Sequence, residues 1–466
     1  MSGRLDFEYG FNSHNAQPIE PDTPMRVYFL GDFSGSQSAV EHNTVNKIIK
    51  IDVDNFDDVM TKLCPSVSLP SGHLLVFNEL EDFHPDSLFE HSVFKNLRRL
   101  KKELANSASA EQASQEIMTS FQLSTESVQA TDDKAGTPTA VEGSDDMFER
   151  LLGQKQSSPA VAATSAPQAK GQIDNFLADL LSSHIIKDAK PEHQSLMVFI
   201  DSALEELMYS ILHAKEFQAL ESAWLSVRDV LFNEEYADEN QFFYLINTDS
   251  AALKSAVAGD VSLATKFSQH IKNTDVNTYD VLIGNYQFCA DNNDITALNY
   301  LASLAETLKC QFVSAAGDSL IDADATSLWH AFRKTPQAKH VALTYPKVLL
   351  RIPYGEKHEE VDGFAFEEFR HTHQHNQLLW GNSAFTCARL LIRKYHGLVA
   401  YDTHITERSA FVYEEDDEQK LYPCAEYLLS EQQLIDIRKK GISPFASYRN
   451  KNNIRLFGDE VKAVNA

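Results

Sequence analysis

The sequence has little positive charge for its length. Its 466 residues include 41 Lys and Arg against 67 Asp and Glu, a formal net charge of −26 at neutral pH. A surface this acidic repels phosphate backbones and anionic lipid headgroups. Nucleic acid and membranes are therefore not expected as partners, and the one small basic cluster predicts a solvated helix face: Arg98, Arg99, Lys101 and Lys102.

Paired cysteines and long apolar runs are also absent from the sequence. The five cysteines are odd in number, widely spaced and form no CxxC pair. This pattern disfavours a disulfide framework or a thiolate zinc site and favours reduced thiols in a cytoplasmic compartment. The N-terminal residues have no basic region followed by an apolar one, and no apolar run reaches the roughly 18 residues of a membrane-spanning helix. We therefore expect no signal peptide and no membrane insertion.

The chain lacks the glycine-rich motifs of common catalytic loops. An apolar run "RVYFL" leads into "GDFSG", residues 31–35. A nucleophile elbow requires G-x-S-x-G, a Walker A loop requires a lysine after its last glycine, and a dinucleotide loop requires three glycines. None of these patterns fits. The segment instead predicts a turn after a strand, in which Asp32 and Ser34 bind local amides and glycine permits a positive φ.

Histidines recur at every second position in "RHTHQHNQ". On a strand, His371, His373 and His375 would share one face, and three histidines can hold a catalytic zinc. No H-E-x-x-H pattern accompanies them, so a polar loop is the favoured interpretation and a metal-dependent hydrolase the alternative. The sequence thus predicts no catalytic residue, no cofactor and no metal, a profile that suits an assembly subunit better than an enzyme.

The hydrophobic pattern predicts an α/β protein in which two mixed α/β domains are joined by a low-complexity linker. After an N-terminal tail, residues 1–24, strands and helices indicate a small domain over 25–104. Residues 105–189 are rich in Ala, Ser, Thr, Gln and acids and predict a disordered linker. Over 190–466, strands alternate with helices, which favours a largely parallel sheet; the predicted strands are 242–246, 279–283, 311–314 and 340–345.

Two apolar islands interrupt or border the linker. They are residues 145–154 and 173–183, each with Phe and Leu at helical spacing behind an acidic turn. A helix this short is marginal alone in water, so each island either folds on a partner or docks on its own chain. The candidate contact residues are Phe148, Leu151, Leu152, Phe176, Leu177 and Leu180.

Several motifs resemble the type VI secretion contractile sheath. "EFQALESAWLSVRDVLF" (216–232), "PKVLLRIPYGEKHEEVDGFAFEE" (346–368) and "LLWGNSAFTCARLL" (378–391) resemble, in order, segments of the large sheath subunit, the TssC, VipB or EvpB type. "RVYFLGDFSG", "DNFDDVM" and "DFHPDSLFEHSVFKNLRRL", over residues 25–104, resemble the small subunit, the TssB type. The chain resembles a small-subunit-like domain joined to a large-subunit-like domain.

This resemblance implies a structural role. Sheath subunits form a helical tube around an inner tube, and contraction of the sheath drives effector delivery into a target cell. The implied partners are other sheath subunits and the inner tube protein, with the baseplate and an AAA+ unfoldase as further candidates. In that family the unfoldase engages a short helix near the start of the large subunit, where the two islands lie here.

Two departures from the family pattern leave an alternative open. Both halves lie on one chain, whereas the usual sheath uses two. The chain also ends soon after "SPFASYRNKNNIRLF", where large subunits continue into a segment that takes part in strand exchange between neighbours. The alternative is an accessory protein that associates with the sheath or baseplate of the same apparatus but does not polymerise.

The motifs also supply candidates for a partner interface. They are Trp224 with its helix, Arg351 and Tyr354 of "RIPYG", and Trp380 with its helix. The alternative for each is an intramolecular core position, with Arg351 as an ion-pair residue and residues 353–355 as a turn.

Overall fold

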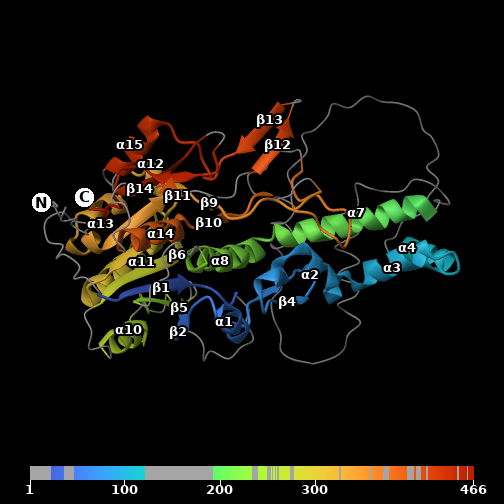
Figure 1. The fold of residues 1–466 in the computed structure, drawn as a ribbon, viewed down its shortest axis with the longest axis horizontal. Coiled ribbons are helices and arrows are strands. Elements are labelled where there is room, and N and C mark those ends of the chain that lie inside the picture. The colour runs from blue at the N-terminus through green and yellow to red at the C-terminus, as the bar shows by residue number, and fades with distance from the viewer. Residues whose placement is uncertain are drawn as a thin grey trace, which may run out of the picture. The chain divides into compact units, whose positions relative to one another are not determined.

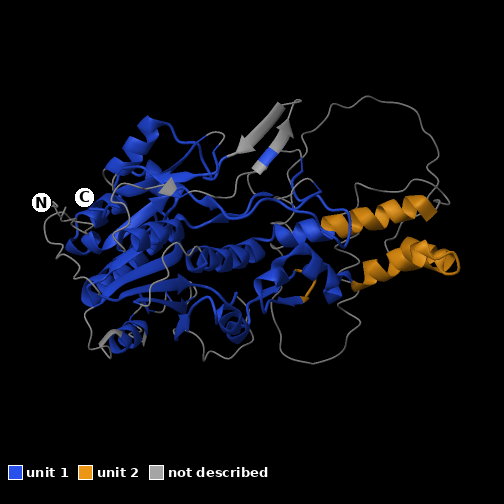
Figure 2. Ribbon diagram, viewed as in Figure 1, with its two compact units in different colours: residues 1–69, 74–94, 207–466 blue, residues 70–73, 95–206 orange. Residues whose placement is uncertain are grey.

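A computed structural model describes much of the chain. The described residues are 23–35, 47–120, 193–232, 240–248, 253, 256–257, 259, 262–272, 278–324, 327–356, 359–370, 377–395, 404–405, 411–415, 418–448, 451–458 and 460–465. The chain divides into two compact units, shown in Figure 2: the first comprises residues 1–69, 74–94 and 207–466, and the second comprises 70–73 and 95–206.

A nine-stranded sheet, as counted over the described residues, forms the centre of the first unit (Figure 1). Its strands lie in the order β11-β15-β14-β8-β7-β6-β1-β5-β2. Their bounds are β1 Met25–Gly31, β2 Ile48–Ile51, β5 Gln241–Asn247, β6 Tyr279–Phe288, β7 Gln311–Ala316, β8 Val341–Tyr345, β11 His404–Ile405, β14 Ile442–Ser447 and β15 Ile454–Leu456. The strands predicted near 26–30, 242–246, 279–283, 311–314 and 340–345 are therefore confirmed.

The middle of this sheet is parallel and its two edges are antiparallel. Strands β14, β8, β7, β6, β1 and β5 pair in parallel, whereas β2 pairs antiparallel with β5, and β15 pairs antiparallel with both β14 and β11. The predicted alternation of strands and helices thus produces the parallel sheet that such alternation favours.

Strand β1 lies inside the sheet, between two strands from much later in the chain. Val27 is paired with Phe243 of β5 on one side and with Val281 of β6 on the other. The sequence predicted that residues 25–104 would form a domain apart from 190–466. The structure differs, because the strands of both regions belong to one sheet.

The physical reason is the continuous apolar character of β1. All seven of its residues are buried, which is typical of a strand covered on both faces in the interior of a parallel sheet. The other strand of the N-terminal region in this sheet, β2, pairs with β5 and not with β1. The neighbours of β1 therefore come from elsewhere in the chain.

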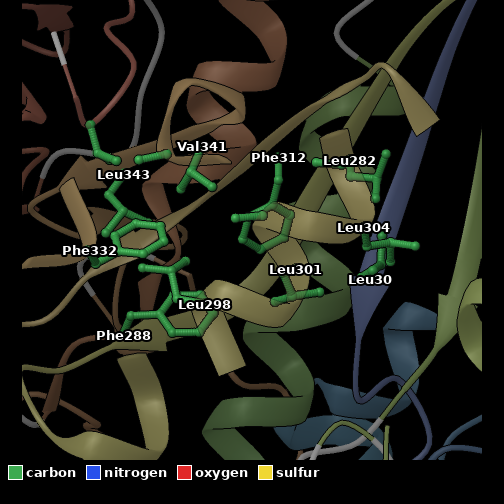
Figure 3. Packing of buried hydrophobic residues seen from close by; sticks show 14 of the residues in the cluster. Leu30, Leu282, Phe288, Leu298, Leu301, Leu304, Phe312, Phe332, Val341 and Leu343 are labelled. Carbon is green, nitrogen blue, oxygen red and sulfur yellow. The ribbon is translucent and has the colours of Figure 1, made fainter. Parts of the chain in front are cut away.

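One face of the sheet is covered by α10 (Ser262–Lys272), α11 (Asn292–Leu308) and α13 (Leu328–Arg333). Leu298 and Leu301 of α11 pack in one buried cluster with residues of β6, β7 and β8 (Figure 3). Helices α10 and α11 precede β6 and β7 in the chain, in agreement with the predicted alternation of strands and helices.

The other face carries α8 (Lys215–Leu231) and α14 (Ser383–Tyr395). Phe385 of α14 stacks on Phe29 of β1 with ring centroids 5.5 Å apart, and Phe29 in turn stacks on Phe243. The sequence predicted that Trp380 lies on a helix, but Trp380 belongs to the strand β10 (Trp380–Gly381) and α14 begins only at Ser383. Asn382 lies between β10 and α14. Its Oδ1 accepts the amide of Ala384 at 2.9 Å, as a helix-capping asparagine does.

Shorter elements complete the first unit. They are α1 Phe56–Leu63, β3 Ser66–Ser68, β4 Leu74–Val76, η1 Leu80–Phe83, α2 Pro85–Glu90, η2 Ser92–Phe94, α12 Asp318–Asp322, η4 Pro336–His340, β9 Val348–Leu349, β12 Phe411–Glu415, β13 Glu418–Tyr422 and α15 Glu431–Lys439. Helix α15 ends just before Gly441, which has a φ of +78°.

The second unit consists largely of helices: α3 Lys95–Ala105, α4 Ala110–Ser120 and the first part of α7 (His193–Leu212). Lys101 of α3 pairs with Asp201 of α7 at 2.8 Å, and Arg99 pairs with Glu103 at 2.7 Å and also with Glu116. Two members of the basic cluster are thus neutralised by nearby carboxylates.

None of the described helices is long and apolar enough to cross a membrane. The described residues likewise contain no group of three or more His, Cys, Asp or Glu side chains that could hold a metal ion. The histidines at positions 371, 373 and 375 lie outside the described residues.

A buried ion pair joins β1 to β6. Arg26 donates through Nε to Oδ1 and through Nη2 to Oδ2 of Asp280, both at 2.7 Å, and through Nη2 to the Thr278 hydroxyl at 2.6 Å. Arg26 is 2% exposed and Asp280 is 7% exposed. Arg26 lies directly opposite Asp280 in the register of the two strands, so the pair matches this register and no neighbouring one.

We predict that Asp280→Ala lowers the free energy of unfolding by about 3–5 kcal/mol, because it leaves the Arg26 guanidinium buried without its counter-charge. Replacing the pair jointly, Arg26→Met with Asp280→Leu, is expected to recover most of this loss. Urea unfolding followed by tryptophan fluorescence measures both. A single variant as stable as the natural chain would contradict the prediction.

Candidate functional site

The carboxyl edge of the parallel strands is the usual position of a ligand-binding site in a sheet of this kind. In chain order the five strands β1, β5, β6, β7 and β8 occupy the sheet positions 2-1-3-4-5. In sheets of this order, ligands bind at the carboxyl ends of the strands where the order reverses, here between β1 and β6.

The start of α14 fills the space beside that point. Asn382 donates through Nδ2 to the carbonyls of Gly284 (3.2 Å) and Tyr286 (2.9 Å). The hydroxyl of Ser314, on β7, donates to the same two carbonyls at 2.9 and 2.8 Å. A Cβ placed on Gly31, at the end of β1, would lie only 2.7 Å from the Cβ of Asn285. The chain's own side chains therefore occupy this edge.

The segment "GDFSG" forms the predicted turn at the end of β1. Asp32 accepts the amides of Ser34 (3.1 Å) and Gly35 (2.9 Å) on Oδ1. Gly35 has a φ of +78°, and a Cβ on it would lie 2.1 Å from the carbonyl oxygen of Ser66. Asn247 accepts the amide of Phe33 at 2.8 Å. The expectation that Asp32 binds local amides and glycine supplies the positive φ is confirmed.

The most densely charged buried site centres on Arg351. Its guanidinium donates through Nε to Oε1 of Glu221 at 2.6 Å and through Nη1 to Oε2 of Glu368 at 2.7 Å. Its Nη2 approaches the second oxygen of Glu368 at 3.1 Å. Both glutamates are 1% exposed. We call Arg351, Glu221 and Glu368 the Arg351 cluster.

Tyr354 completes the wall of this cluster. The Arg351 guanidinium lies over the Tyr354 ring, 4.3 Å from the ring centroid. The backbone amide of Tyr354 donates to Oε2 of Glu368 at 2.9 Å. On its other side the ring meets that of His84 edge-on at 4.8 Å. The predicted ion-pair role of Arg351 is therefore confirmed in an intramolecular setting, and Tyr354, 6% exposed, belongs to the same core.

The "DFHPD" segment docks on the chain between Tyr354 and Glu368. The carboxylate of Asp86 accepts the amides of Gly363 (2.8 Å) and Asp362 (3.3 Å). Phe89 stacks on Phe364 with ring centroids 4.8 Å apart. This contact joins a segment of the N-terminal region to the C-terminal region, next to the Arg351 cluster.

The cluster has an unequal charge balance. One guanidinium faces two carboxylates, so an excess negative charge is buried when both glutamates are ionised. Burial raises the pKa of Glu221, and although Arg351 opposes this shift, the pKa stays above its ordinary value. Burial by itself lowers the pKa of Arg351, but the charges of Glu221 and Glu368 outweigh burial and hold that pKa well above its ordinary value.

His213 lies beside the cluster. Its Nε2 is 3.7 Å from Oε1 of Glu368, and its Nδ1 lies 2.8 Å from the carbonyl of Tyr209. Burial lowers the pKa of His213 below its ordinary value, and the nearby Glu368 charge only partly offsets this effect. The neutral imidazole is therefore the favoured form in the folded protein.

The remaining predicted site residues have different environments. Trp224 is fully buried, donates through Nε1 to the carbonyl of Phe33 at 3.0 Å and meets the rings of Phe33 and Phe56 edge-on. It is a core residue and presents no surface to a partner. Trp380 is half-buried and pairs with Leu349 of β9. The other candidates lie outside the described residues: Phe148, Leu151, Leu152, Phe176, Leu177 and Leu180.

Sequence reasoning found the motifs but missed that their charges pair. Glu221 lies within "EFQALESAW", Arg351 within "RIPYG" and Glu368 within "FAFEE". The available signal was a charge next to an apolar residue in each motif, since an ionised side chain that becomes buried needs a partner. Which charge pairs with which could not be deduced, because more than a hundred positions separate Glu221 from Arg351.

We predict that Arg351→Met lowers the free energy of unfolding by about 3–5 kcal/mol, because it leaves two buried carboxylates without a cation. The matched control is Lys439→Gln, which removes an exposed cation 2.9 Å from Asp436. The control should leave the unfolding midpoint unchanged, because exposed pairs contribute little. Equal effects of the two substitutions in urea unfolding would contradict a structural role for the cluster.

We further predict a pH effect of His213. Because its pKa is lowered on folding, the unfolded chain binds the proton more readily, so this group's contribution to stability is complete above about pH 6.5 and is lost as the pH falls below it. His213→Gln should therefore flatten the decline of unfolding free energy between pH 7 and pH 5. Parallel curves for the variant and the natural chain would refute this assignment.

Comparison with known proteins gives matches in both halves of the chain. The family model "EvpB/VC_A0108, tail sheath N-terminal domain" (VipB) matches residues 194–462. A model for the type VI secretion system protein VipA (VC_A0107 or Hcp2) matches residues 2–131.

A curated relative is the type VI secretion system sheath protein TssC1 of Pseudomonas aeruginosa strain PAO1. The two sequences are 24% identical over 312 residues, which cover 59% of this chain and 62% of the relative. The chain thus matches less than two thirds of that relative's length.

Proposed function

The chain belongs to the VipB/EvpB family of type VI secretion tail sheath proteins, with a VipA-type region on the same chain, and on this premise we propose that it is a structural subunit of a contractile sheath. In this proposal the subunits assemble around an inner tube, and contraction of the sheath drives effector delivery. The protein acts in the bacterial cytoplasm and has no enzymatic role.

The observation that carries the proposal is the position of β1. This strand belongs to the VipA-type region, and both of its partners, β5 and β6, belong to the VipB-type region. One chain therefore contains both kinds of strand that this sheet requires. In this proposal a single polypeptide contributes both the VipA-type strand and its VipB-type neighbours to one sheath subunit.

The environment of the charged residues supports a structural role over a catalytic one. The Arg351 cluster and the Arg26–Asp280 pair are buried and satisfied by partners from the chain itself. The carboxyl edge between β1 and β6 is filled by the start of α14. Side chains used in this way hold segments together and are not presented to a substrate.

The partners that follow from this proposal are further sheath subunits and the inner tube protein. Baseplate components and an AAA+ unfoldase are the next candidates. Mutual repulsion between subunits that each carry a net charge of −26 predicts that assembly strengthens as salt is added, because salt screens repulsion between like charges.

We predict that the purified chain, alone or with the products of neighbouring genes, forms tubes or rings visible by negative-stain microscopy. Light scattering should show larger particles at higher ionic strength. The Arg351→Met variant is the control for folding, since loss of the building block should abolish tubes. A persistent monomer or dimer under all these conditions would contradict the sheath subunit and favour an accessory protein of the same apparatus.

A further inference from the structure

A pocket of about 450 Å³ opens beside the Arg351 cluster. Its lining includes four half-buried apolar side chains and two exposed charged ones: Leu80, Leu225, Leu350, Ile352, Arg228 and Glu359. These residues come from η1, from α8 and from the chain around Arg351. Two of these segments, α8 and the chain around Arg351, are the ones that the Glu221–Arg351 ion pair joins.

The charges that line the pocket differ in availability. Glu221 and Arg351 also line it, but each is neutralised by the other at 2.6 Å. Arg228 is exposed, and among the described residues its guanidinium contacts the ring of Phe232 at 5.7 Å but no carboxylate. Glu359 likewise has no ion pair with any residue that the structure describes. Within the part of the chain that the structure describes, the pocket therefore combines an apolar wall with one cation and one anion that have no ion-pair partner.

The apolar surface extends along α8 beyond the pocket. Leu225, Arg228 and Phe232 are spaced by three and four residues and so lie on one helical face. Phe232 is 42% exposed. Arginine and aromatic side chains are enriched in protein interfaces, whereas glutamate is depleted from them. Of the two free charges, Arg228 is therefore the one suited to pairing with a partner.

We propose that this pocket docks a peptide segment of a partner protein that presents an aliphatic side chain next to a carboxylate. The aliphatic side chain enters between Leu225 and Ile352, and the carboxylate pairs with Arg228. The planar guanidinium favours a carboxylate, with which it forms two parallel hydrogen bonds. Glu359 repels the same carboxylate and so orients the segment with its acidic end toward α8.

The test uses the full chain and a defined probe. The probe is a short fluorescein-labelled amphipathic peptide with Leu and Asp on one helical face, and the matched peptide has Asn in place of Asp. Fluorescence anisotropy should show that the Asp peptide binds about tenfold more tightly, the scale of a charge pair in an interface. Equal affinities for the two peptides, or no binding of the Asp peptide, would overturn the proposal.

Substitutions of opposite sign sharpen the test. Arg228→Gln should abolish the preference for the Asp peptide, whereas Glu359→Gln should strengthen binding of that peptide about twofold or more, because it removes a repulsion. Lys266→Gln removes an exposed cation from α10 and should change nothing. An Arg228→Gln protein with unchanged thermal midpoint and unchanged peptide preference would refute the assignment.

This inference is independent of sheath assembly. Peptide binding is measured on the purified chain at low salt and does not require tubes. Tubes without peptide binding would refute the docking pocket and leave the sheath subunit intact. Peptide binding by a chain that never forms tubes would refute the sheath subunit and leave the pocket.

Discussion

The pairing of β1 with β5 and β6 is the constraint on which the rest of the structure depends. The strand is buried along its whole length, and each of its backbone partners comes from beyond residue 240. A buried strand needs hydrogen-bond partners on both edges, because an unpaired peptide group inside a protein is costly. Strand β1 therefore supplies the pairing between β5 and β6 across the middle of the sheet, and among the described residues of the N-terminal region the other sheet is the two-stranded β3–β4 pair, which does not include β1.

Buried ion pairs then make this arrangement specific. Arg26 and Asp280 stand opposite each other in the β1–β6 register, and the Arg351 cluster joins α8 to the segment around Tyr354. Apolar contacts tolerate small shifts of register or helix position, but a buried charge without its partner is expensive. Both sites thus penalise misplaced pairings more strongly than hydrophobic packing does.

The same features bear on function. In the proposed sheath role the subunit transmits force and needs segments that remain joined. Ion pairs join α8 to the "RIPYG" segment, and hydrogen bonds to Asp86 together with ring contacts of His84 and Phe89 attach the chain around "DFHPD". Next to these paired charges, the pocket holds Arg228, a cation on an apolar surface that has no ion-pair partner among the described residues. The contrast between satisfied and unsatisfied charges separates the residues that hold the fold from those available to a partner.

The sequence by itself determined the α/β class, the main strands and helices, the turn after β1 and the sheath family, because these depend on local periodicity, turn chemistry and contiguous motifs. Only the tertiary structure decided that β1 lies between β5 and β6, that Trp224 is core, and that Glu221, Arg351 and Glu368 meet. These outcomes depend on contacts between residues far apart in the chain. The hydrophobic pattern and the charge of such a residue indicate that it needs a partner in the fold. They carry no information about which distant residue is that partner.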